Sequence, residues 1–286
     1  MDKVVVTCDS TADLNHLFEE RDIKVIPLVV NLGTNSFLDG VTICPNDIYK
    51  YVAACGELPK TAARNEEDFY GFFKQFTDQG FEVVHVSISS GLSINVDVAL
   101  KAAAKLKGVY IVDSKSLSTG VGLTALYACD LRDEGRSGKE IAELVRARTP
   151  AVQASFVLTT VEYLHKGGRC SGLSALMATT LMIKPTIVME NGKMHPGKKY
   201  FPCTYQRAVP KYVDDILEKF NTPDPKRVFI THTSASPEIV ERVRETLKAT
   251  GKFEQIIETV AGATITSHCG KGTLGILYYN DGSKAK

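Results

Sequence analysis

Hydroxyl and glycine residues follow apolar, strand-like stretches at three places in the first 120 residues of the chain. These hydroxyl-rich segments are Thr7–Thr11, Ser87–Ser93 and Asp113–Gly120, and a helical pattern follows each of them. Hydroxyls and free backbone N–H groups should therefore gather at the carboxyl ends of strands, where open α/β sheets bind ligands and helix N-termini favour anions. The segments contain no cysteine pair, histidine cluster or paired carboxylates. They predict a pocket that holds an anionic group rather than one that breaks bonds.

Single side chains in these loops also have ordinary structural explanations. Ser90 and Ser93 fit a cluster of helix N-caps, and so does Ser116. Thr61, which follows Pro59-Lys60, is by itself a loop threonine. Each of these residues becomes a site candidate only when it is considered with the others.

Two further candidates lie in the second half of the chain. His268 stands between hydroxyl residues and the glycine-rich turn Gly270–Gly275. Because glycines let backbone approach a ligand closely, this imidazole fits a ligand contact and an ordinary structural hydrogen bond equally well. Arg169 follows Gly167-Gly168 and fits either a functional cation at a turn or a solvated one.

The segment Gly270–Gly275 matches the G-x-G-x-x-G pattern of dinucleotide-binding sites. Such a site needs a helix and a further strand downstream, with an acidic residue about 20 residues later. Here only the short strand-like stretch Ile276–Tyr279 and a polar end follow. We therefore reject a dinucleotide site, and the chain also has no P-loop pattern and no G-x-S-x-G nucleophile pattern.

The elements that would position these loops alternate between strands and helices over residues 1–150. Strand patterns are expected at 3–8, 24–30, 82–88 and 108–113. A helix is expected near 66–79 from its apolar stripe, and another after Ser137, a plausible N-cap with Glu140 three residues later. This alternation predicts a mainly parallel sheet covered by helices.

Residues 151–286 have a different pattern. Strands are expected near 152–160, 185–189, 226–232, 253–260 and 273–279, and helices at about 173–182, 205–220 and 237–250. Asn191-Gly192 is a strong hairpin signal. We therefore predict an α/β chain of two domains, an α/β domain over 1–150 and an α+β domain over 151–286, joined near Thr149-Pro150.

The composition excludes several classes of protein. The chain has 286 residues, of which 44% are hydrophobic and 23% charged, as is ordinary for a globular protein. Its net charge of +1 gives no reason to expect nucleic acid or an anionic membrane as a partner. We expect no signal peptide and no membrane helix. The seven scattered cysteines indicate reduced thiols and hence a cytoplasmic protein.

Taken together, these motifs and several others resemble those of one family, in the same order from residue 9 to about 275. The matching segments are Asp9–Leu14, Pro59–Thr61, Ile88–Ser93, Val112–Gly120, Glu162–Leu164, Lys166–Arg169, Lys184-Pro185, Gly192-Lys193, Pro196 and His268–Gly275. The chain resembles the DegV family. DegV-like proteins are two-domain α/β proteins that hold a long-chain fatty acid between the domains. The better-understood members carry the acyl chain for a bacterial fatty-acid kinase, whose separate ATP-binding subunit phosphorylates the bound carboxylate.

The resemblance implies roles for particular residues. Thr61, Ser93 and His268 would contact the carboxylate, and Arg169 would face the kinase partner. Further ligand-binding candidates are Ser90, Ser116 and Gly270. The resemblance implies a carrier with no catalytic residue, cofactor or metal of its own.

The chain departs from the family pattern at several positions. Ala62–Asn65 replace the usual polar segment after Thr61, Ile94 replaces a glycine after Ser93, and Lys271 replaces a proline. Phe201 stands where the family has an arginine. The loss of that cation bears more on docking to a kinase than on lipid binding.

A fatty acid also fits the residues physically. A buried sixteen-carbon tail would contribute on the order of 10 kcal/mol, and its carboxylate must find donors when it leaves water. Apolar residues of the helix expected after Gly172 could line the tail, or could simply pack the core. These residues are Leu173, Leu176, Met177, Leu181 and Met182.

Two other functions compete with lipid carriage. A serine hydrolase or acyltransferase could use Ser93 with His268, but it would also need an orienting carboxylate and an oxyanion hole. A kinase-like transferase could use the anion-binding loops, but it would need a P-loop or acidic metal ligands. The sequence shows none of these features.

Overall fold

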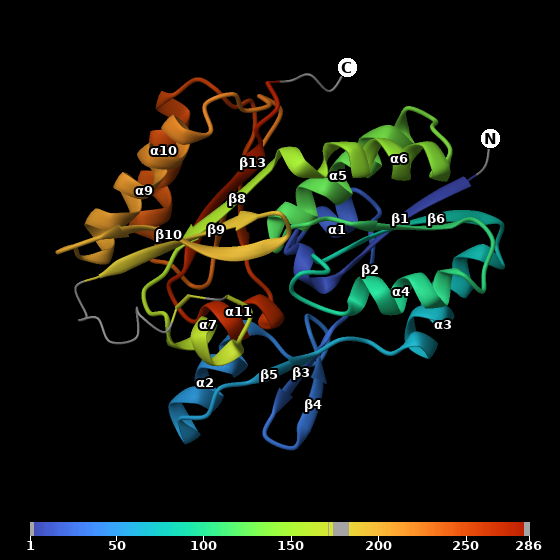
Figure 1. The fold of residues 1–286 in the computed structure, drawn as a ribbon, viewed down its shortest axis with the longest axis horizontal. Helices are drawn as coiled ribbons and strands as arrows, with labels where there is room; N and C mark the ends of the chain where they lie inside the picture. The colour runs from blue at the N-terminus through green and yellow to red at the C-terminus, as the bar shows by residue number, and fades with distance from the viewer. Residues whose placement is uncertain (1–2, 171, 174–182, 283–286) are drawn as a thin grey trace.

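A four-stranded parallel sheet and a six-stranded mixed sheet carry the fold in the computed structural model, which describes residues 3–170, 172–173 and 183–282 (Figure 1). The parallel sheet has the order β2-β1-β6-β7. Its strands are β1 (Lys3–Asp9), β2 (Lys24–Ile26), β6 (Phe81–Ser87) and β7 (Val109–Asp113). The α/β class predicted for the chain is confirmed.

Helices cover both faces of the parallel sheet. They are α3 (Glu66–Thr77) and α4 (Asn95–Ala103) on one face, and α5 (Thr119–Asp133) and α6 (Gly138–Arg148) on the other (Figure 1). Because strand side chains alternate, Val5 packs in the cluster with α3 and α4 while its neighbour Val6 packs in the cluster with α5 and α6. Ser137 and Glu140 form the expected capping box at the start of α6.

The strand expected over 24–30 is not continuous, and that prediction is wrong. β2 ends at Ile26, and after Pro27 the chain leaves the parallel sheet. Proline has no N–H to donate to a ladder, so it ends the pairing there. The next strands form a separate antiparallel sheet of order β4-β3-β5, which we had not predicted. They are β3 (Val29–Leu32), β4 (Asn35–Leu38) and β5 (Lys60–Ala62).

The mixed sheet has the order β10-β9-β8-β13-β11-β12. Its strands are β8 (Val152–Val157), β9 (Lys184–Glu190), β10 (Lys193–Tyr200), β11 (Val228–His232), β12 (Ile256–Val260) and β13 (Leu274–Tyr279). Within it, β11 and β12 are parallel and the other neighbours are antiparallel. The expected hairpin joins β9 to β10, with Asn191 and Gly192 both at positive φ.

Two helices of the second half pack beside the mixed sheet, as expected. They are α9 (Tyr205–Lys219) and α10 (Pro237–Ala249), which contribute to a second core cluster with β11 and β13 (Figure 1). None of the described helices is long and apolar enough to cross a membrane.

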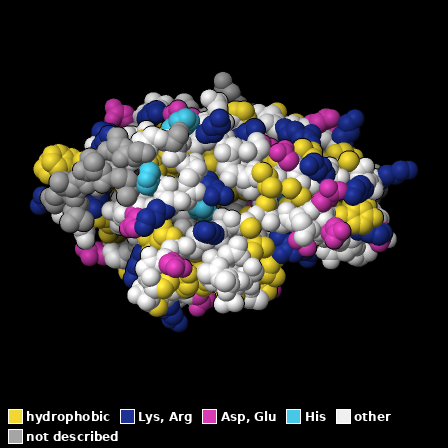
Figure 2. All heavy atoms as spheres, turned by 60° about the horizontal axis from the view of Figure 1, so that its bottom comes forward, with side chains coloured by type: hydrophobic (Ala, Val, Ile, Leu, Met, Phe, Trp, Pro, Cys, Tyr) yellow, Lys and Arg dark blue, Asp and Glu magenta, His cyan; other side chains and the backbone are white. Residues whose placement is uncertain are grey.

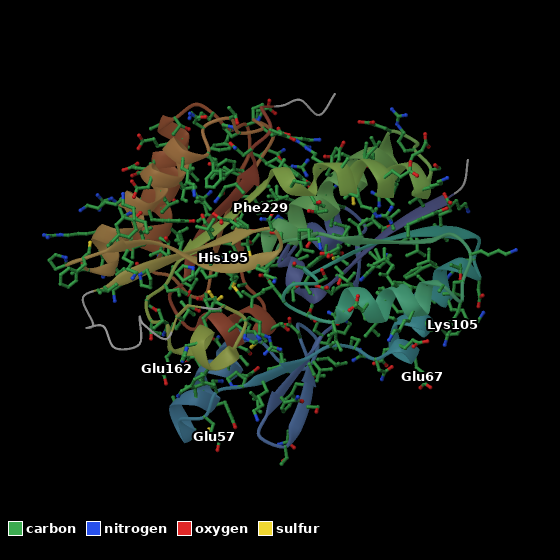
Figure 3. All side chains as sticks on the ribbon, viewed as in Figure 1. Glu57, Glu67, Lys105, Glu162, His195 and Phe229 are labelled. Carbon is green, nitrogen blue, oxygen red and sulfur yellow. The ribbon has the colours of Figure 1, made fainter. Side chains whose placement is uncertain are left out.

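One core cluster runs through both halves of the chain. Val84 and Val121 from the first half share it with Phe156, Phe229 and Leu277 from the second, and Figure 3 shows Phe229 inside the fold on β11. The halves therefore meet through a buried apolar contact. The division at residue 150 into two domains remains a prediction.

Charged groups also join the halves, in a mostly buried cluster. The Arg148 guanidinium at the end of α6 donates to Asp281 (Nε to Oδ2, 2.7 Å) and to Asp224. Its Cζ atom also lies over the rings of Tyr127 and Tyr279, at 4.7 and 3.9 Å from their centroids. Arginine suits such a site because its planar fork pairs with carboxylates while its face stacks on aromatic rings.

Candidate functional site

A cavity lies among α7 (Glu162–Gly167), α11 (Ala263–Cys269), β5 and the loops after β6 and β7. The space between its lining atoms is about 600 Å³, part of which is open to solvent. Figure 2 turns α7, α11 and β5 toward the viewer, and basic and imidazole side chains gather near the middle of that face. The polar lining residues are Thr61, Ser93, Arg169, Thr264 and His268. The other lining residues are mostly apolar, so the cavity offers donors among apolar walls.

Thr61 and His268 lie 207 residues apart in the chain and are hydrogen-bonded, with 2.7 Å between Oγ1 and Nε2. Thr61 reaches this position because β5 pairs with β3, where Thr61 lies opposite Val30. His268 lies near the end of α11, whose first N–H groups are held by two buried carboxylates. Gly262 N–H donates to Asp13 and Ala263 N–H donates to Asp39.

Burial and the nearby positive charge of Arg169 lower the pKa of His268 to about 4. The imidazole is therefore uncharged at neutral pH. Its Nδ1 is buried and has no hydrogen-bond partner among the described residues. A neutral imidazole carries one N–H donor, so either Nε2 or Nδ1 can serve an incoming acceptor, directly or through Thr61.

Ser93 is held in a tight turn after β6 that is organised by Ser89. The Ser89 carbonyl accepts the N–H groups of Leu92 (2.9 Å) and Ser93 (3.1 Å). The fully buried Ser89 hydroxyl donates to Gly192 O at the tip of the β9–β10 hairpin (2.7 Å). Ser93 Oγ accepts the N–H of Asn95 (3.3 Å), which leaves its O–H available to a ligand. The turn that carries Ser93 is thus fixed to the other half of the chain.

Arg169 lines the same cavity as Thr61, Ser93 and His268, and its Nη1 donates to Gly167 O (2.7 Å). A side chain at Gly167 would place its Cβ 2.5 Å from His268 Nδ1, so only glycine lets α7 approach α11 this closely. The Gly167-Gly168 pair therefore brings the guanidinium and the imidazole to one site.

Comparison with known proteins gives the family. The family described as "Uncharacterised protein, DegV family" matches residues 3–281. The chain belongs to the DegV family. A relative named "Fatty acid-binding protein" from Thermotoga maritima is 29% identical over 285 residues, with 96% of each chain covered.

Solved DegV structures share the fold over nearly the whole chain. A structure from Thermus thermophilus titled "Fatty Acid Binding of a DegV family Protein" is 28% identical, covers 97% of this chain and 99% of its own, and has a TM-score of 0.87. A DegV lipid-binding protein from Thermotoga maritima is 27% identical, with 97% and 98% coverage and a TM-score of 0.83.

The structure brings only part of the predicted DegV site together. Thr61, Ser93, His268 and Arg169 line one cavity, whereas Ser90, Ser116 and Gly270 do not line it. Ser90 is exposed and its hydroxyl accepts from Lys115 Nζ (3.0 Å). Ser116 is buried elsewhere. Gly270 packs against the Tyr163 ring and leads through a turn into β13, which agrees with the rejection of a dinucleotide site.

Thr264 is a polar lining residue that sequence reasoning did not select. It lies four residues before His268, so both side chains point from one face of α11. Its hydroxyl is buried and has no partner among the described residues. The four-residue spacing was the signal that could have identified it.

The apolar wall comes from residues that we had not chosen for it. It includes Leu28, Ile88, Leu92, Leu117, Met194 and Ile265. Leu173, which we had expected to line the tail, is buried in the main core cluster and is not among the lining residues. The other residues that we had expected to line the tail, at positions 176, 177, 181 and 182, lie outside the described residues.

The geometry does not favour a serine hydrolase. The His268 Nε2 is bonded to Thr61 rather than to Ser93, and no carboxylate lies against Nδ1 in the described part of the chain. Catalysis by a triad needs both of those contacts. The described residues also contain no group of three or more histidine, cysteine or acidic side chains placed to hold a metal ion.

Proposed function

We propose that this chain binds a long-chain fatty acid in the cavity, with the carboxylate at Thr61, Ser93 and His268. The observation that carries the proposal is the convergence of these side chains, from three distant segments, at a cavity whose other walls are mostly apolar. The names of the Thermotoga and Thermus relatives support the same ligand class.

The donor set suits a reversibly held carboxylate. A carboxylate that leaves water without donors loses several kcal/mol, so hydroxyl and imidazole donors are required. The donors from Thr61, Ser93 and His268 are uncharged at neutral pH, because burial keeps the pKa of His268 at about 4. Arg169, at the same cavity but more exposed, adds a positive charge nearby. These uncharged donors and the nearby positive charge can hold the carboxylate while leaving it accessible to a second protein.

We further propose that the chain is a cytoplasmic carrier rather than an enzyme by itself, and that it presents the carboxylate to a separate ATP-binding kinase subunit. No covalent step on this chain is needed, because the partner would transfer the phosphoryl group to the ligand. Arg169 would face that partner or the transferred phosphate, for which a planar guanidinium is well suited.

Lipid analysis of the purified protein tests the ligand. We expect protein from a bacterial host to release about one long-chain fatty acid per chain on denaturation, detected by mass spectrometry. After delipidation, palmitate and oleate should show saturable binding. If neither binds while a soluble phosphorylated metabolite does, the fatty-acid proposal is wrong.

Arg169→Ala tests the partner-facing role. We expect palmitate affinity within about threefold of wild type but acyl-phosphate formation at least about tenfold slower when an ATP-binding subunit is supplied, because the phosphate loses its bidentate donor. Arg169→Lys is the matched control, since it keeps the positive charge and removes the planar pair of guanidinium donors. Impaired lipid binding with unchanged phosphorylation would instead assign Arg169 to the carboxylate.

Ser89→Ala tests the turn that holds Ser93. The substitution removes the hydroxyl that joins Gly91 N–H (3.1 Å) to Gly192 O (2.7 Å). Leaving these groups unpaired should lower the free energy of unfolding by about 1–3 kcal/mol. Fatty-acid dissociation should also become faster, because Ser93 is no longer fixed to the hairpin. Urea unfolding and stopped-flow displacement measure both effects, and Ser90→Ala, at the exposed neighbour, should change neither by much.

A further inference from the structure

The hydroxyl of Thr264 lies at the cavity but has no role in the carboxylate site proposed above. Thr264 lines the cavity and is only 5% exposed, and its Oγ1 has no hydrogen-bond partner among the described residues. Other hydroxyls of α11 are satisfied within the helix. Thr266 donates to Ala261 O (3.4 Å), and Ser267 donates to Ala263 O (2.7 Å). Because buried hydroxyls are normally hydrogen-bonded, the hydroxyl of Thr264 lacks a partner that a ligand in the cavity can supply.

Thr264 is separated from the carboxylate donors by one turn of α11. It lies four residues before His268 on the same face of the helix, so the two Cβ atoms are about 5–6 Å apart. The apolar wall is tied to the end of α11 that carries Thr264. Leu28 N–H donates to Ser10 Oγ (3.1 Å), and Ser10 donates to Asp39 (2.9 Å), which also accepts the first N–H of α11. Thr264 therefore faces the start of the tail.

An unsubstituted fatty acid does not suit this position. Beyond its carboxylate it offers only methylenes, which would cover the hydroxyl of Thr264 and leave it without a hydrogen bond. A threonine hydroxyl has one donor and two acceptor sites, so it pairs with a ligand hydroxyl in either direction. A hydroxyl group on one of the first carbons of the tail is the chemistry that fits.

We propose that the preferred ligand is a long-chain fatty acid with a hydroxyl group close to its carboxylate, as in a 3-hydroxy acid, and that Thr264 recognises this hydroxyl. The inference rests on the proposed function, because it requires the carboxylate to lie at Thr61, Ser93 and His268. A site with a buried hydrogen-bonding group discriminates against an analogue that lacks the matching group, since its own group is then left unpaired. Thr264 is thus a specificity residue.

Palmitate and 3-hydroxypalmitate test the inference on the delipidated protein by calorimetry. We expect wild type to bind 3-hydroxypalmitate about tenfold more tightly than palmitate. Thr264→Val keeps nearly the same shape and removes the hydroxyl. The variant should bind palmitate at least as tightly as wild type does, because no hydroxyl is left unpaired. It should bind 3-hydroxypalmitate about tenfold more weakly, because the ligand hydroxyl is then buried without a partner.

Two controls separate recognition from packing. Thr264→Ser keeps the hydroxyl and should keep the preference for the hydroxy acid. Thr266→Val makes the same chemical change on α11, at a buried residue that does not line the cavity, and should leave the ratio of the two Kd values unchanged. Should Thr264→Val fail to fold by circular dichroism, Thr264→Ala removes the same hydroxyl and is measured with the same two acids.

The outcomes are distinguishable. Loss of the preference in Thr264→Val, with Thr264→Ser and Thr266→Val keeping it, supports recognition of a ligand hydroxyl. The inference is overturned if wild type binds the two acids equally, or if Thr264→Val weakens both by one factor, which would make Thr264 a further donor to the carboxylate. Both results leave the fatty-acid proposal standing. Failure of both acids to bind wild type overturns the proposed function itself.

Discussion

His268→Ala is expected to weaken palmitate binding about 5- to 150-fold without unfolding the protein. The substitution removes a buried donor near the carboxylate and also leaves Thr61 Oγ1 without its partner at 2.7 Å. A buried anion short of one donor loses about 1–3 kcal/mol. Fluorescence displacement with palmitate measures the loss, and circular dichroism confirms the fold.

A double-mutant cycle of Thr61 and His268 tests whether the two side chains bind the carboxylate as a unit. Because Thr61 and His268 contact one another, Thr61→Ala and the double variant should not lose affinity additively. His195→Ala is the control, since His195 lies on β10 and is not among the lining residues of the cavity (Figure 3). Wild-type affinity in a folded His268→Ala protein would show that the carboxylate lies elsewhere.

His85 is expected to make the fold sensitive to acid. The side chain is fully buried on β6, where Thr7 Oγ1 lies 2.9 Å from Nδ1 and the rings of Phe69 and Phe73 pack against it. Burial lowers the pKa of His85 to about 3. The unfolded chain has the ordinary pKa of about 6.5, so it binds more protons than the folded chain between these values.

The sign of the effect follows from that difference. The stability contributed by a neutral His85 is present above pH 6.5 and is lost as the pH falls toward 3. The slope is about 1.4 kcal/mol per pH unit, which amounts to roughly 3 kcal/mol by pH 4. His85→Phe removes this titration. The variant also loses the hydrogen bond to Thr7, but the free energy of that loss does not vary with pH.

Urea unfolding of both proteins at pH 7, 6, 5 and 4 measures the difference. Other buried groups, including His268 and the raised-pKa carboxyl of Asp9, titrate in both proteins and cancel in the comparison. Wild type should lose stability relative to the variant at each step below pH 6.5. Parallel curves for the two proteins would contradict a neutral, buried His85.

Most of the helices and strands could be predicted from local patterns, because such a pattern depends only on which side chains of one segment are buried. The apolar stripe of α3 and the capping box of α6 depend on residues within a few positions of one another. The break at Pro27 was also visible in principle, since proline cannot continue a ladder. We missed this break because the residues on both sides of Pro27 are apolar and together form the pattern of one strand.

The site was less predictable from spacing alone because its contacts are long-range. The small sheet pairs β5 with β3, and only that pairing brings Thr61 to α11. No local pattern encodes the contact between Thr61 and His268, so the family resemblance was needed to select both. Arg169 shows the limit of this approach, because the resemblance assigned it to a partner while the structure also places it at the cavity.

The apolar wall of the cavity is also part of the core that joins the two halves. Leu117, Leu164 and Ile265 belong to both. A bound tail would therefore complete the core, and a ligand at 100 times its Kd stabilises the fold by about 2.7 kcal/mol. Since proteolysis acts on opened chains, the ligand-free form would be degraded sooner. The amount of this protein in a cell would then follow the supply of free fatty acid without any change in transcription.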